Sequence, residues 1–169
     1  MTWWPWLLLL CGCGPHWTEP TSLDYSDPEQ WTVCVDLPAA RQADAFKGVM
    51  AWSTALERWR FLKPVSGSSG ACSVWIHETD TGGGESPAMG AWVSQIGARE
   101  VNMVRGRYEP YTLPVTLHEL GHVLGAQHVA WTTMSKAQDL KAVCPDQMSV
   151  VQVAAWNHID PGLLRWCYF

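Results

Sequence analysis

The sequence feature that most constrains this chain is a histidine pattern at residues 118–128, which reads HELGHVLGAQH. The pattern is H-E-x-x-H-x-x-G-x-x-H. Because His118 and His122 are four residues apart, they would lie on one face of a helix, one turn above the other. The leucines of the same stretch fall on the opposite side, so the predicted helix has one ligand face and one core face.

The same pattern predicts a metal site. Gly125 can adopt a positive φ and reverse the chain, which would bring His128 back to the two helical histidines. Three neutral imidazoles leave the fourth position of a tetrahedral zinc open, as in catalytic rather than structural sites. We therefore expect one Zn²⁺ held by His118, His122 and His128, and we expect Glu119 to act as a general base rather than as a ligand.

The motif, together with Met134, resembles the metzincin metallopeptidases. These enzymes have a methionine in a tight turn beneath the zinc, and Met134 follows His128 by six residues, a spacing closest to that of the matrixins. The resemblance implies an α+β, zincin-like domain, with a twisted mixed sheet and long helices that include the zinc helix and a C-terminal helix. It also implies extended peptide substrates paired with an edge strand, for which 88–94 is the candidate. The specificity pocket would have its wall at about 135–140.

The chain departs from particular metzincin groups, and the subfamily stays open. Val129 follows the third histidine, where some groups have an acidic residue, and no tyrosine closely follows Met134 as in the astacin-like group. The segment from His77 to Asp80 suggests a second metal of the kind that matrixins carry. A single histidine at a strand end is more often structural, so we expect one metal ion.

The remaining chain predicts a mixed α and β domain. Strands are expected at 31–37, 72–78, 88–94 and 100–104, with a turn-rich break at 66–70. A long helix is expected from Pro38 to about Lys63, because its apolar residues recur at helical spacing: Ala45, Val49, Trp52, Leu56 and Trp59. A final helix would begin at a capping box formed by Ser149 and Gln152.

The N-terminus resembles an export signal. The apolar run at 3–10 is too short to span a bilayer, and it suits the apolar region of a signal peptide. The stretch from Leu10 to Cys13 resembles a bacterial lipobox, with Cys13 as the lipidated residue, although no Lys or Arg precedes the run. We expect a signal peptide at 1–12, a tether at 13–30 and the catalytic domain at 31–169. A plain secretory signal and a wrongly assigned start are the alternatives.

Cysteine usage agrees with an extracytoplasmic protein, either lipid-anchored or secreted. Without Cys11 and the lipidation candidate Cys13, the chain has four cysteines, an even number that suggests two disulfides with three possible connectivities. We expect Cys34 to pair with Cys72, which would link the first two strands, and Cys144 to pair with Cys167, around the last helix. Free thiols are the alternative.

Composition narrows the function. The 169 residues fit one domain, the 47% apolar residues are enough for a core, and the net charge of −5 without a basic stripe argues against nucleic-acid binding. We expect a monomeric zinc-dependent endopeptidase that acts on a peptide or protein. The alternatives are a zinc-containing scaffold lipoprotein without hydrolysis, which the intact Glu119 argues against, and an enzyme that hydrolyses a non-peptide amide.

Overall fold

The computed structural model describes residues 31–56, 63–67, 72–80, 91–94, 99–106, 109–135, 140–160, 162 and 164–166. Its helices are α1 (Ala39–Ala55), α2 (Thr112–Val123), α3 (Gln147–Trp156) and the short 3₁₀ helix η3 (Glu109–Tyr111). Its strands are β1 (Thr32–Asp36), β2 (Lys63–Ser66), β3 (Val74–Thr79), β4 (Ala91–Ser94) and β5 (Arg99–Val104).

The strands form one mixed sheet in the order β2-β1-β3-β5-β4. The pairs β1/β2, β1/β3 and β3/β5 are parallel, whereas β4 runs antiparallel to β5, with Trp92 opposite Asn102. β4 is therefore an edge strand, as expected for the segment 88–94, of which 88–90 lie outside the described residues. The mixed sheet with its helices confirms the predicted fold class.

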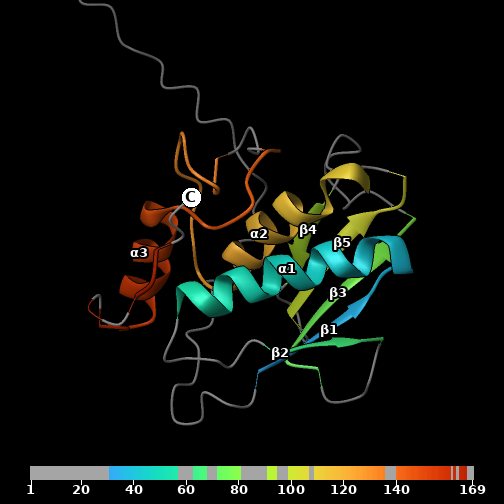
Figure 1. Cartoon of the computed structure of the whole chain (residues 1–169), viewed down its shortest axis with the longest axis horizontal. Helices are drawn as coiled ribbons and strands as arrows, with labels where there is room; N and C mark the ends of the chain where they lie inside the picture. Colours follow the sequence, from blue (N-terminus) through green and yellow to red (C-terminus); the bar gives the residue numbers. More distant parts are fainter. Residues whose placement is uncertain are drawn as a thin grey trace, which may run out of the picture.

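Helices α1 and α2 run side by side against the sheet (Figure 1). α1 contacts β1 and β2, while α2 contacts β4 and β5. The core between these layers includes alternating strand residues, such as Val33 and Val35 on β1, and the predicted apolar face of α1. Trp52 anchors this face, because its indole nitrogen donates a hydrogen bond to the backbone carbonyl of Leu117 at 2.9 Å.

The first helix is shorter than the periodicity predicts. It ends at Ala55, with Leu56 as its C-cap, and the chain at 63–66 forms β2 instead of helix, so the expected helical extent to Lys63 is wrong. The reason is a nonlocal partner, because the Lys63 amide donates to the Trp31 carbonyl at 3.1 Å and the Gly67 amide donates to the Val35 carbonyl at 2.9 Å. Pro64, which lacks an amide donor, is tolerated because β2 is at the sheet edge. Trp59 lies outside the described residues.

The last helix begins earlier than predicted. Asp146, not Ser149, is the N-cap of α3, because the Asp146 carboxylate accepts the Ser149 amide at 3.1 Å and the Ser149 hydroxyl at 2.6 Å. The expected capping box is therefore wrong. The Gln152 side chain instead accepts the backbone amide of Gln127 at 3.1 Å, which ties α3 to the segment after α2.

A disulfide joins Cys34 on β1 to Cys72, with the Cα atoms 5.5 Å apart, and this is the first of the two expected pairs. Cys144 is also disulfide-bonded. Cys167, its expected partner, lies outside the described residues, as do the signal and tether residues with Cys13. None of the helices in the described ranges combines the length and the apolar character needed to cross a membrane.

Candidate metal centre

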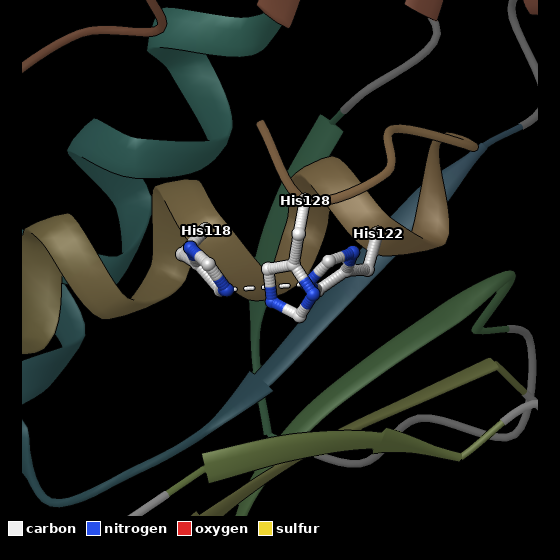
Figure 2. Close-up of side chains that lie close together, drawn as sticks. All are labelled: His118, His122 and His128. Carbon is white, nitrogen blue, oxygen red and sulfur yellow. Dashed lines mark hydrogen bonds between the residues drawn. The ribbon is translucent and has the colours of Figure 1, made fainter. Parts of the chain in front are cut away.

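Three histidine side chains converge beside α2. His118 and His122 project from the helix, and His128 reaches them from the segment that follows (Figure 2). Their candidate ligand nitrogens all lie within 4.8 Å of one another. His118 and His122 are buried and His128 is half-buried. Within the described part of the chain, this is the one cluster of at least three potential ligand side chains that is compact enough for a metal ion.

A tight helix end brings the third histidine back. Gly125 has a φ of 99°, the Gly125 amide donates to the His122 carbonyl at 3.0 Å, and the Ala126 amide donates to the Gly121 carbonyl at 2.9 Å. These two bonds define a Schellman motif. A Cβ at Gly125 would lie 2.4 Å from Cδ1 of Trp156, so both the backbone conformation and the available space require glycine. The chain therefore reverses at Gly125, as the sequence predicts.

Backbone carbonyls fix the orientation of the two helical imidazoles. Nδ1 of His118 donates to the Thr133 carbonyl at 2.8 Å, and Nδ1 of His122 donates to the Ala126 carbonyl at 2.9 Å. A carbonyl oxygen can only accept, so Nδ1 carries the proton in both rings and each Nε2 of a neutral ring presents a lone pair. Carbonyl partners of this kind are typical of histidines that bind a metal.

The two lone pairs point at the same place. The Nε2 atoms of His118 and His122 are 3.1 Å apart, the contact drawn as a dashed line in Figure 2. Two nitrogens bound to one tetrahedral zinc at about 2.0–2.1 Å would be about 3.3 Å apart. The donor set and its spacing therefore fit one zinc ion.

Burial keeps these rings in the form that binds metal. Burial lowers the pKa of His118, against a smaller opposing effect of its bond to Thr133. Burial, followed by the charge that His118 would carry, lowers the pKa of His122 to about 3. Both imidazoles are therefore neutral near pH 7, which is the state that coordinates zinc.

Glu119 follows the first ligand on α2, and its side chain is only 4% exposed. Its carboxylate is not part of the compact ligand cluster. Glu119 is therefore a buried carboxylate that directly follows His118 in the sequence and lies outside the histidine cluster.

Met134 packs directly against α2. The residue is fully buried, and a Cβ at Gly121 would lie 2.4 Å from its sulfur and 3.1 Å from Cζ2 of Trp52. The turn around it is closed by bonds from the Ser135 amide to the Thr132 carbonyl at 2.9 Å and from the Met134 amide to the Thr132 hydroxyl at 3.0 Å. The sequence analysis assigned no role to Gly121. The available signal was its lack of a side chain at a helix position between His118 and His122, which leaves room for close packing.

The turn around Met134 is also hydrogen-bonded to the start of α3. The Asp146 carboxylate accepts the Thr133 amide at 2.6 Å, and the Asp146 amide donates to the Thr133 hydroxyl at 3.1 Å. Burial alone would raise the pKa of Asp146, but bonds from Ser149 and Thr133 outweigh burial and lower it. The ionised Asp146 side chain therefore positions Thr133, and the Thr133 carbonyl in turn orients the His118 ring. Sequence reasoning missed this role.

The segment from His77 to Asp80 has other partners. His77 stacks on Trp75, with ring centroids 4.0 Å apart. Glu78 forms ion pairs with Arg41 and with Arg105, and Asp80 lies 3.1 Å from Arg105. These acidic groups therefore neutralise arginines. Of the expected pocket wall at 135–140, residues 136–139 lie outside the described residues.

No family model and no curated protein sequence matches this chain. Its structure is similar to the crystal structure of archaemetzincin from Methanopyrus kandleri, with a TM-score of 0.59. The two chains are 12% identical, and the match covers 76% of this chain and 96% of that one. The chain therefore has a zincin-like fold, as the family resemblance implies.

Proposed function

We propose that the protein is a zinc-dependent endopeptidase. The observation that carries the proposal is the convergence of two oriented imidazole lone pairs, 3.1 Å apart, with a third histidine beside them. The buried Glu119 next to the first ligand supports hydrolysis over a purely structural metal site. The similarity of the fold to archaemetzincin supports the same class of enzyme.

His118, His122 and His128 would hold the zinc ion. When bound, zinc supplies a Lewis acid that lowers the pKa of a water molecule toward neutrality and stabilises negative charge on oxygen. Glu119 accepts a proton from the attacking water while the water oxygen forms a bond to the carbonyl carbon of the peptide. The same carboxyl group then gives that proton to the leaving amine as the C–N bond breaks, so Glu119 ends the cycle ionised.

The substrate would bind as an extended peptide along β4. An edge strand has unpaired amide and carbonyl groups that can bond to a peptide backbone. β4 is at the sheet edge, and it contacts α2, which carries two of the ligands. A peptide on this edge would therefore lie beside the proposed metal.

The decisive experiment is digestion of a broad peptide library by the zinc-loaded full chain, with and without a chelator. We expect internal cleavages that the chelator abolishes and that added zinc restores. Zinc binding without cleavage would favour the non-catalytic scaffold lipoprotein. Hydrolysis of simple amides without cleavage of peptides would favour the third class, an amidase.

We also propose that the protein acts outside the cytoplasm, as a monomer anchored through a lipid on Cys13 or as a secreted protein. The Cys34–Cys72 disulfide supports an oxidising compartment. Mass spectrometry of the mature N-terminus tests the anchor, and an unmodified Met1 on exported protein would rule it out.

A further inference from the structure

Trp131 is exposed in a way that the fold does not explain. It lies between the third histidine and Met134, and its side chain is 99% exposed. Its φ of 66° is in the left-handed region. Bulky residues adopt that region at an energetic cost that glycine avoids and asparagine reduces. A tryptophan that bears this cost and buries almost none of its surface adds nothing to the core.

The segment that carries Trp131 is held by hydrogen bonds on both sides. The Val129 amide donates to the Met134 carbonyl at 3.0 Å, and the Thr132 hydroxyl donates to the Val129 carbonyl at 2.8 Å. The Thr133 amide is bound by Asp146. Trp131 is thus presented on a closed turn, so its indole can make a contact without a large loss of backbone freedom on binding.

This turn is next to the proposed metal. Trp131 is three residues from His128, so their Cα atoms are at most about 11 Å apart. An exposed indole on a turn this close to His128 is available to a peptide bound at the proposed metal. Backbone strain at exposed positions is concentrated at functional sites, where a side chain must be presented in a particular direction.

We infer that Trp131 is a specificity-determining residue that contacts a large apolar or aromatic side chain of the peptide substrate, close to the scissile bond. The inference rests on the proposed peptidase function. Tryptophan gains both buried area and ring-stacking geometry from such a partner. The preferred substrates would therefore carry an aromatic or large aliphatic residue at one position near the cleaved bond.

The test compares cleavage profiles of zinc-loaded full-length variants on a library that varies each position around the cleaved bond. Trp131→Gly removes the indole and accepts the positive φ, so the folded protein should not lose stability. Trp131→Phe keeps an aromatic ring. Met50→Ala, a matched control, removes another exposed apolar side chain, which belongs to α1 and not to the turn that follows His128.

For Trp131→Gly we expect about 10-fold lower kcat/KM on peptides with the preferred apolar residue, mainly through KM. Peptides with a small residue there should be cleaved as by the parent, and zinc content should not change. Trp131→Phe should be intermediate, and Met50→Ala should match the parent.

Four outcomes would overturn the inference. A Trp131→Gly profile identical to that of a peptidase-active parent would remove it and leave the proposed function intact. A uniform loss across all peptides would mean that Trp131 supports the site rather than reads the substrate. Loss of binding to phosphatidylcholine vesicles with an unchanged profile would make Trp131 a membrane contact. If the parent cleaves no peptide, both the inference and the proposed function fail.

Discussion

Asp146 and Thr133 are hydrogen-bonded to each other in both directions, from the Thr133 amide to the Asp146 carboxylate at 2.6 Å and from the Asp146 amide to the Thr133 hydroxyl at 3.1 Å. The Thr133 carbonyl in turn accepts Nδ1 of His118 at 2.8 Å. The N-terminus of α3 and the first histidine of the proposed zinc site are therefore joined through a single residue, although 28 positions separate His118 from Asp146. The stability of the last helix and the affinity for zinc should accordingly change together.

Replacing Asp146 by alanine should lower both the stability of the protein and its affinity for zinc. The variant loses the N-cap of α3, worth about 1 kcal/mol, and leaves the buried Thr133 amide without its carboxylate, worth about 1–3 kcal/mol. The Thr133 carbonyl would then hold His118 less firmly, and zinc affinity should fall about 10–100-fold. Urea unfolding and a zinc competition titration measure the two effects. Asp44→Ala, which removes only an exposed pair with Lys47, should leave both nearly unchanged.

The contribution of Asp146 should depend on pH in the acid range. Its folded pKa is lowered, so the ionised carboxylate stabilises the native state and protonation removes that contribution. The difference in unfolding free energy between the parent and Asp146→Asn should be largest above the usual aspartate pKa of about 4. This difference in unfolding free energy should shrink as the pH falls through the lowered pKa of Asp146 in the folded protein. Metal-free protein is used for both, because the comparison then excludes zinc release. A difference that does not change from pH 2 to pH 6 would contradict the assignment.

Glu119→Gln should separate metal binding from hydrolysis. The three imidazoles remain, so zinc content should stay near that of the parent, whereas peptide cleavage should fall by at least about 10²–10⁴-fold because the proton acceptor is gone. Zinc is measured by elemental mass spectrometry and cleavage on a library-derived peptide. A variant that cleaves as fast as the parent would show that Glu119 is not the general base.

Alanine in place of His118 or His122 should remove both zinc and activity, because two nitrogen ligands hold zinc poorly. His128→Ala should weaken zinc binding as well, since its ring belongs to the same cluster. His158→Asn is a suitable control. His158 is exposed, is not part of the cluster and has a φ of 57°, which asparagine tolerates. Unchanged zinc affinity in His128→Ala would exclude the third ligand.

The sequence predicted the parts of this site that depend on local spacing. His118 and His122 share a face because they are four residues apart on one helix, and Gly125 reverses the chain through bonds within six residues. The buried face of α1 follows the same local rule. Met134 was predicted through a family resemblance, and in the structure its sulfur packs against Gly121 of α2.

The parts that the sequence did not predict depend on distant partners. β2 forms because β1 offers it a parallel edge, which no local pattern encodes. Ser149 satisfies the local rule for an N-cap. The Asp146 carboxylate, however, accepts both the Ser149 amide at the start of α3 and the amide of the distant Thr133, and the bond to Thr133 fixes Asp146 as the N-cap. Gly121 was overlooked because the need for a missing side chain arises only when Met134 and Trp52 are packed against it.

Gly125→Ala tests whether the chain reversal sustains the metal site. Alanine must adopt a φ of 99°, and its Cβ would lie 2.4 Å from Cδ1 of Trp156. Gly67→Ala is the matched control, because Gly67 also has a positive φ, 81°, but nothing lies within 4 Å of its Cβ position. The control should lose about 1 kcal/mol of stability, which is the backbone cost alone. Gly125→Ala should lose distinctly more in urea unfolding, together with zinc affinity, because the reversal positions His128. In the double variant Gly125→Ala/Trp156→Ala, the stability lost through the collision with Trp156 should be recovered, whereas the cost of the positive φ should remain. Equal losses in the two single variants, with zinc affinity unchanged, would show that His128 reaches the metal without this turn.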